Sequence, residues 1–245
     1  MDTFLFKLKF NGSTHFGETG IDLENVSERI NSDTLFSALI NAYKEMDGLD
    51  KVSKFIALFK NNPPFIISSL YLYTRNHFFL PKPLYDNHIG SNLRREFGKE
   101  LKKLKWLNID GFIKWQRSEI NAKDIEEMIE IQNIYKEAFI TDIRPRVTID
   151  RNTEQSTLYH SGYLYFKEEA GLYGFVSFND NSYIGLFKEL LQFLGTLGLG
   201  GERTYGCGTF EVIYFEKVSD SFMKILYENQ NFYILLSLYH PCLLY

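Results

Sequence analysis

The stretch "GLGGERTYGCGTF", residues 198–210, combines a bare backbone with one cation and one aromatic ring. Six glycines fall within fourteen residues, namely Gly195, Gly198, Gly200, Gly201, Gly206 and Gly208. Where Cβ atoms are missing, backbone N–H groups can approach a bulky anionic chain, while an arginine pairs with phosphate and a tyrosine offers a stacking face. We therefore expect a loop that contacts RNA or phosphate through Arg203, Tyr205 and the backbone of Gly198, Gly200, Gly201 and Gly206.

A plain turn and a nucleotide-binding loop would also use glycines of this kind. A helix C-cap followed by a tight turn uses glycine because φ is positive there, and this explains one or two of the glycines but not six. Rossmann and P-loop glycines lie between a strand and a following helix. Here an amphipathic helix pattern comes first, and the stretch contains no Gly-Lys-Ser/Thr. The sequence therefore disfavours a nucleotide-hydrolysing loop.

His15 lies in a glycine-flanked loop after the first expected strand, where a catalytic group could be placed. A metal-independent RNA-cleaving site needs a base that takes the 2′-OH proton and groups that stabilise the charge of the phosphorane. His15 has no obvious second histidine or tyrosine at a fixed sequence spacing. We interpret it as a structural or RNA-contacting histidine and keep a metal-independent endoribonuclease as the alternative function.

Composition narrows the class of protein. A chain of 245 residues with 44% hydrophobic residues can bury the core of one large domain or two small ones. The formal net charge of -4 argues against coating nucleic acid through bulk charge, although a local basic face could still bind it. Cys207 and Cys242 have no partners at metal-ligand spacing, so we expect no disulfide framework, metal or cofactor. Without a signal-peptide pattern or a membrane-length apolar run, we expect a cytoplasmic protein.

Hydrophobic periodicity predicts the elements that position these residues. Phe4, Phe6, Leu8 and Phe10 recur with period two and predict a strand. Ser32 or Asp33 is expected to cap a helix that runs to residue 46, and residues 182–198 form an amphipathic helix before the glycines. Residues 64–83 predict a strand and a short return strand. Further strands are expected in residues 142–152, 156–166, 171–178, 209–215 and 232–241, and a short helix in 221–229.

The segment from about residue 81 to residue 156 departs from this alternation. Residues 91–117 carry eight basic side chains, at Arg94, Arg95, Lys99, Lys102, Lys103, Lys105, Lys114 and Arg117, against three acidic ones. Residues 119–137 reverse the sign, with six acidic side chains against two lysines, and repeat apolar residues at helical spacing, at Ile125, Met128, Ile129 and Ile131. We interpret both as an insertion. The basic part could meet RNA or an acidic partner, but a solvated helical face is the favoured interpretation.

Without the insertion, the expected element order predicts an α+β fold with a split βαβ, ferredoxin-like (RRM-type) βαββαβ domain. We expect this domain to span residues 1–217, with the insertion at about 81–156 and the glycine-rich loop at 198–208. Residues 218–245 are expected to begin a second ferredoxin-like domain, apparently truncated, because the chain stops on an apolar strand.

The glycine stretch resembles the glycine-rich signature of the RAMP superfamily of CRISPR proteins, which follows the second helix of a ferredoxin-like domain. The order of "THFGETG", "SDTLFSALINAY", "FFLPKP", "RPRVTIDRNTEQSTLYHSGYLYF" and "LLSLYHP" is similar to one branch of that superfamily. That branch is the subunit of the type III-A Csm effector complex that caps the 5′ handle of the CRISPR RNA (crRNA). Such subunits usually continue well past the "SLYHP" strand.

The resemblance implies a non-catalytic scaffold rather than an enzyme. Its expected partners are the 5′ tag of the crRNA, the large polymerase- and HD-containing subunit, and the adjacent backbone RAMP subunit, with no membrane. The resemblance also implies a hairpin that reaches the RNA, where the residues supply charge, hydrogen bonding and stacking, at Arg144, Arg146, Arg151, Asn152, Tyr159 and His160. Related RNA-processing enzymes of the superfamily use an N-terminal histidine, which is why the His15 alternative stays open.

Overall fold

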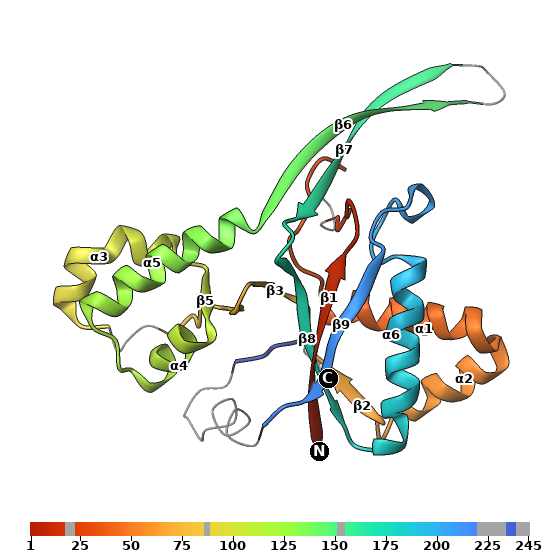
Figure 1. Cartoon of the computed structure of the whole chain (residues 1–245), viewed down its shortest axis with the longest axis horizontal. Helices are drawn as coiled ribbons and strands as arrows, with labels where there is room; N and C mark the ends of the chain where they lie inside the picture. Colours follow the sequence, from red (N-terminus) through yellow and green to blue (C-terminus); the bar gives the residue numbers. More distant parts are fainter. Residues whose placement is uncertain (18–22, 86–88, 151–154, 220–233, 239–245) are drawn as a thin grey trace, which may run out of the picture.

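The protein is a mixed α+β molecule built around one antiparallel sheet (Figure 1). The computed structural model describes residues 1–17, 23–85, 89–150, 155–219 and 234–238. The sheet contains β1 (Asp2–Phe10), β2 (Phe65–Ile67), β3 (Tyr71–Thr74), β4 (His77–Pro81), β5 (Trp106–Asn108), β8 (Ala170–Phe178) and β9 (Phe210–Lys217). The helices are α1 (Ser32–Asp47), α2 (Leu49–Leu58), α3 (Ser91–Lys103), α4 (Ile109–Arg117), α5 (Ala122–Glu137) and α6 (Ile184–Leu197). The expected α+β class is confirmed.

The sheet runs in the order β5-β4-β3-β8-β1-β9, and β2 also pairs with β8. Every neighbouring pair is antiparallel. The two central strands, β1 and β8, are therefore hydrogen-bonded on both sides. After β1 the chain forms α1, and after β8 it forms α6, before it returns to the sheet. This arrangement brings the start of α1 and the end of α6 to the same part of the molecule (Figure 1).

The period-two pattern of β1 has the expected consequence. Phe6, Leu8 and Phe10 are buried in a core shared with α1, α2 and α6, which lie together on one side of the sheet (Figure 1). Alternate side chains of a strand point to opposite faces, so Lys7 lies on the other face, among the rings of Tyr73, Phe78 and Tyr214. Burial of this ammonium lowers the pKa of Lys7.

A second core lies under the part of the expected insertion that forms α3, β5, α4 and α5. Trp106 stacks on Tyr135, with ring centroids 5.2 Å apart, and Trp115 is fully buried. This helical lobe packs on the β4 and β5 edge of the sheet, away from α1 and α6 (Figure 1).

A long hairpin of β6 (Phe139–Ile149) and β7 (Ser156–Phe166) forms a separate two-stranded sheet. It extends from the body of the molecule (Figure 1). The hairpin expected around "RPRVTIDRN" is therefore confirmed as an element. Two of the expected RNA-binding residues of this segment, Arg151 and Asn152, lie outside the described residues.

Two local expectations were wrong. The strand expected from residue 64 breaks into β2 and β3. The Ser68 hydroxyl accepts a hydrogen bond from the Phe175 amide of β8, and the Ser69 amide donates to the Leu236 carbonyl rather than to a neighbouring strand. The N-cap of α1 is Asn31, not Ser32 or Asp33. Ser32 is buried, and its amide donates to the Ser69 hydroxyl while its own hydroxyl accepts from the Leu238 amide.

The C-terminal expectations are largely untested. The helix expected in residues 221–229 lies outside the described residues, and residues 234–238, which are described, form no strand. Within the described part of the chain, no helix has the length and apolar character needed to cross a membrane.

Candidate nucleic-acid interface

Helix α6 delivers the chain into the glycine-rich loop. Phe187, Leu190, Leu191 and Leu194 bury one stripe of the helix in the core, and the helix ends at Gly198, whose amide donates to the Leu194 carbonyl at 2.9 Å. The loop closes on itself where the Leu199 amide donates to the Gly208 carbonyl, also at 2.9 Å. Its position is therefore fixed by the same core that holds the sheet.

Most of the loop glycines are required by the fold itself. At Gly208, φ is +77° and a Cβ atom would lie 2.0 Å from the Leu199 carbonyl oxygen. At Gly200, φ is +99° and a Cβ atom would lie 2.6 Å from the His15 carbonyl oxygen. Close approach or positive φ also applies at Gly195, Gly198, Gly201 and Gly206. The expectation that turn geometry explains only one or two of the six glycines was wrong.

The loop amides divide into two groups. The Gly201 amide donates to the His15 carbonyl at 2.8 Å, and the Gly208 amide donates to Ser13. The amides of Gly200, Glu202, Arg203 and Thr204 have no acceptor among the described residues. All four residues line one hollow, together with Leu197 and Gly201. The exposed part of the loop therefore keeps hydrogen-bond donors for a ligand.

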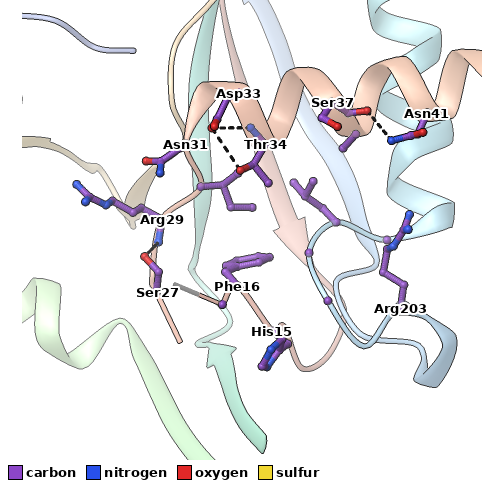
Figure 2. A pocket seen from close by; sticks show the side chains of 17 residues that line it. His15, Phe16, Ser27, Arg29, Asn31, Asp33, Thr34, Ser37, Asn41 and Arg203 are labelled. Carbon is purple, nitrogen blue, oxygen red and sulfur yellow. Dashed lines mark hydrogen bonds between the residues drawn. The ribbon is translucent and has the colours of Figure 1, made fainter. Parts of the chain in front are cut away.

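A pocket of about 790 Å³ separates the loop from α1. Figure 2 shows Asp33, Thr34, Ser37 and Asn41 along the helix, with Arg203 on the side of the loop. The remaining wall comes from His15 to Gly17, Ser27, Arg29 to Asn31, Ala38 and residues 198–201. Mostly polar side chains around an open pocket provide hydrogen bonds along the length of a flexible polar ligand.

Two arginines supply positive charge to this pocket. The Arg203 side chain is exposed and has no acceptor among the described residues. Arg29 is also exposed, and its guanidinium lies 5.9 Å from the centre of the Trp106 ring. At the N-terminus of α1, which also borders the pocket, the Ser32 and Thr34 amides donate to the Ser69 hydroxyl and the Asp33 carboxylate. With two arginines against the one carboxylate of Asp33, the pocket carries a net positive charge and favours an anionic ligand.

His15 forms part of the pocket wall rather than an exposed contact. The residue is 6% exposed, and its Nδ1 lies 2.7 Å from the Gly162 carbonyl oxygen on β7. A carbonyl oxygen can only accept, so Nδ1 carries the hydrogen and, in the neutral ring, Nε2 keeps the lone pair. A Cβ atom on Gly201 would lie 2.7 Å from the Cδ2 atom of the His15 ring. His15 therefore joins the hairpin to the glycine loop.

The hairpin meets the loop through Arg146. Its Nε and Nη2 atoms donate to the Tyr163 hydroxyl at 3.0 and 2.7 Å, and its guanidinium lies 4.4 Å from the centre of the Tyr205 ring. Arg144 lies two residues before Arg146 on β6. It pairs with Asp142 at 3.0 Å and lies over the rings of Tyr163 and Tyr165. Arg146 and Tyr205 thus form one cationic and aromatic surface.

The structure brings most of the predicted residues together. His15, Gly198, Gly200, Gly201 and Arg203 share the pocket. Tyr205 and Gly206 lie at the exposed tip of the loop, beside Arg146. Arg144 does not line the pocket. No group of three or more metal-ligating side chains occurs among the described residues.

Sequence reasoning missed the α1 wall of the pocket. Thr34, Ser37 and Asn41 follow one another at three- and four-residue spacing, which places them on one face of a helix. This polar stripe was a readable signal. Arg29 and Asn31 had no such signal, because only the fold brings the loop before α1 next to the glycine loop.

Comparison with known proteins identifies the family. The RAMP superfamily profile matches residues 7–211. The "CRISPR system Cms protein Csm4" of Thermococcus onnurineus (strain NA1) is 30% identical over 198 residues, which cover 78% of this chain and 64% of that protein. The protein of the same name from Methanocaldococcus jannaschii is 25% identical and covers 95% and 71%. The chain thus spans 64% to 71% of the length of these relatives.

Solved structures share the fold. A chain in the crystal structure of a Csm3-Csm4 subcomplex of the type III-A CRISPR-Cas interference complex gives a TM-score of 0.60 at 22% identity, covering 94% of this chain and 74% of that chain. A chain in the Csm1-Csm4 cassette bound to pppApA gives 0.57 at 21% identity, covering 89% and 71%. The family profile matches from within β1 through α1, α6 and the glycine-rich loop to the start of β9, so this chain belongs to the RAMP superfamily of CRISPR proteins.

Proposed function

We propose that the protein is a non-catalytic RNA-binding scaffold subunit of a type III-A CRISPR effector complex that holds the 5′ tag of the crRNA. The observation that carries the proposal is the cationic, polar pocket between α1 and the glycine-rich loop. The Csm4 relatives support the same class of complex.

The pocket suits a single strand of RNA better than a duplex. Arg203 and Arg29 can pair with successive phosphates, and the α1 side chains can bond ribose hydroxyls and base edges. Tyr205, at the exposed tip of the loop, is 65% exposed and offers a base-stacking face. With a chain net charge of -4, the affinity depends on this local surface and on neighbouring subunits that share phosphate contacts.

The proposed protein partners are the large polymerase-like subunit and the adjacent backbone RAMP subunit. Support comes from the solved structures with this fold, which contain Csm1-Csm4 and Csm3-Csm4 pairs. We also propose that β1, α1, β3, β8, α6 and β9 form the ferredoxin-like core, because the order β3-β8-β1-β9 is the antiparallel order of a βαββαβ sheet. The β2 strand is then a short addition that pairs with β8.

A metal-independent endoribonuclease is the competing function, and one observation favours it. The bond from His15 to the Gly162 carbonyl leaves Nε2 as the basic nitrogen, the form a general base needs. However, the ring is buried, and the same bond orients it as a structural link between β7 and the loop. The scaffold is therefore the preferred proposal.

The test is incubation of labelled crRNA carrying its 5′ tag with the protein, with and without the large subunit, in the presence of a chelator. A tag-scrambled RNA, the Arg203→Ala variant and an Arg95→Ala control on α3 are run beside it. Binding and product length are read from the same gel. Tag-dependent binding without cutting, weakened about tenfold by Arg203→Ala and unchanged by Arg95→Ala, is the expected result.

Two results would contradict the proposal. Cleavage that survives the chelator and disappears in His15→Ala would assign the endoribonuclease instead. Indifference to RNA even with the large subunit present would leave the glycine loop as a turn and the pocket without an RNA ligand.

A further inference from the structure

Glu28 and Arg29 are neighbours in the loop before α1 and carry opposite charges, yet each side chain contacts a different ring of the helical lobe. The Glu28 carboxylate accepts a hydrogen bond from the Tyr135 hydroxyl at 2.7 Å. The Arg29 guanidinium lies 5.9 Å from the centre of the Trp106 ring. Neither charged side chain forms an ion pair with a described residue. The lobe therefore keeps two adjacent, opposite charges apart.

The two rings that make these contacts are themselves fixed in the second core. Trp106 on β5 and Tyr135 on α5 are both buried, and they stack on each other with ring centroids 5.2 Å apart. Burial, together with the neighbouring Glu28 carboxylate, raises the pKa of Tyr135, so the hydroxyl keeps its hydrogen and donates it. A hydrogen bond to an ionised acceptor is about twice as strong as one between neutral groups. The hydroxyl therefore holds the Glu28 carboxylate firmly.

The environment of Arg29 matters because Arg29 lines the pocket between α1 and the glycine-rich loop. Figure 2 shows Arg29 and Arg203 on opposite sides of that pocket. A guanidinium over an aromatic ring uses its flat face, so its N–H groups stay available to a phosphate. A guanidinium paired with a carboxylate has those N–H groups occupied and its charge neutralised. The Glu28 carboxylate would therefore compete with a phosphate for Arg29 if nothing else held it.

We propose that Tyr135 is a positioning residue, which holds the Glu28 carboxylate and so keeps Arg29 available for an RNA phosphate. The helical lobe then acts on the pocket through the loop before α1, although none of the residues of α3, β5, α4 and α5 lines the pocket. The identity of the ligand rests on the proposed function, whereas the separation of the two charges rests on the contacts of Glu28 and Arg29 themselves.

The experiment compares variants of the full chain in their affinity for tagged crRNA, with the large subunit present, over a series of salt concentrations. Tyr135→Phe removes the hydroxyl and keeps the stacked ring. Glu28→Gln keeps an acceptor for the hydroxyl and removes the charge, and a third variant combines the two changes. Tyr173→Phe is the matched control, because Tyr173 is also buried in the second core and donates to the Phe79 carbonyl at 2.8 Å, and neither residue lines the pocket.

Tyr135→Phe is expected to lower the affinity about fivefold and the slope of log affinity against log salt by about 1, since the released Glu28 carboxylate takes Arg29 from a phosphate. The combined variant is expected to bind within about twofold of the wild type, because a glutamine side chain cannot neutralise a guanidinium. Glu28→Gln alone and Tyr173→Phe should also stay within about twofold of the wild type. Rescue by removal of a charge is not expected if the hydroxyl only stabilises the lobe.

A second measurement needs no RNA. Phenylglyoxal modifies arginine side chains, and a guanidinium paired with a carboxylate reacts more slowly. The rate of modification at Arg29 is followed by mass spectrometry on the chain alone, with Arg203 as the internal reference. This rate is expected to fall about threefold or more in Tyr135→Phe and to return in the combined variant, because only the former has a charged partner for Arg29.

The other outcomes also decide the question. Wild-type affinity in Tyr135→Phe, or a loss that Glu28→Gln does not rescue, would overturn the proposal. An equal gain from Glu28→Gln with and without the Tyr135 hydroxyl would overturn it too, because Glu28 would then act on the RNA directly. Equal reactivity of Arg29 in all variants would contradict the pairing. If no variant binds RNA but the reactivity of Arg29 changes as expected, the proposed function fails while the separation of the charges stands.

Discussion

The guanidinium of Arg146 lies 4.4 Å from the centre of the Tyr205 ring, so the projecting hairpin and the glycine-rich loop meet through a cation–π contact. The same guanidinium donates two hydrogen bonds to the Tyr163 hydroxyl. Arg146 is therefore held in place from its own hairpin before any ligand arrives. The two segments expected to contact RNA form one continuous surface.

Replacing the Tyr205 ring should weaken RNA binding more than removing its hydroxyl. Tyr205→Ala is expected to cost about tenfold in affinity for tagged crRNA, since one base–aromatic stack contributes roughly 1–3 kcal/mol. Tyr205→Phe should retain most of that affinity, because the ring also remains available to Arg146. Fluorescence anisotropy with Tyr214→Ala as an exposed-tyrosine control measures this. Equal losses for Phe and Ala would show that the hydroxyl, not the ring, makes the contact.

The charge of Arg203 should appear in the salt dependence of binding. Arg203→Ala is expected to lower the slope of log affinity against log salt by about 1, because one phosphate contact releases about one counterion. Arg203→Lys should keep the slope while losing affinity, since lysine cannot pair bidentately. Titrations between low and physiological salt provide the measurement. An unchanged slope in Arg203→Ala would remove Arg203 from the phosphate contacts.

Two loop glycines separate steric from conformational requirements. Both Gly206 and Gly208 have positive φ, but a Cβ atom at Gly206 meets nothing within 4 Å, whereas at Gly208 it would lie 2.0 Å from the Leu199 carbonyl oxygen. Gly206→Ala is expected to cost about 1 kcal/mol in the free energy of unfolding. Gly208→Ala should lower the free energy of unfolding by about 2 kcal/mol more, because Leu199 and Gly208, which close the loop, must move apart. Chemical denaturation measures both, and equal losses would contradict the close packing at Gly208.

The helical lobe should show a pH-dependent contribution from Asp124. This carboxylate accepts from the Lys114 ammonium and from the Asn121 amide at the start of α5, and these bonds lower its pKa. A lowered folded pKa stabilises the fold above the unfolded value of about 4, and the contribution is lost as the pH falls through the folded pKa.

Asp124→Ala removes this capping interaction and should destabilise the protein by about 1 kcal/mol at neutral pH. The difference from the wild type should narrow progressively below about pH 4. Urea unfolding at a series of pH values compares the two proteins. A difference that stays constant at low pH would mean that packing, rather than the ionised cap, supplies the stability.

Elements with strong periodicity could be predicted from the sequence. The alternation from Phe4 to Phe10 gave β1, and the stripe from Phe187 to Leu194 gave α6 leading into the glycines. Ser68 escaped prediction because its hydroxyl takes over a backbone hydrogen bond of β8, which breaks a strand that the apolar pattern continues.

The candidate site was predictable in part. Arg203 and Tyr205 stood out by residue type beside glycines. The contact between Arg146 and Tyr205 joins residues far apart in the chain, and sequence spacing carries no information about it. The role of Gly208 was likewise hidden, because the Leu199 carbonyl that excludes a side chain there is placed by the closure of the loop.

The claim that the pocket between α1 and the glycine-rich loop holds the crRNA tag is tested most directly by photocrosslinking. A crRNA with photoreactive nucleotides in its 5′ tag is bound to the protein together with the large subunit, irradiated, and the linked peptides are identified by mass spectrometry. We predict crosslinks in residues 29–41 and 198–206, which line the pocket and the exposed loop. Crosslinks confined to the helical lobe of α3 to α5, with none in those two segments, would contradict it.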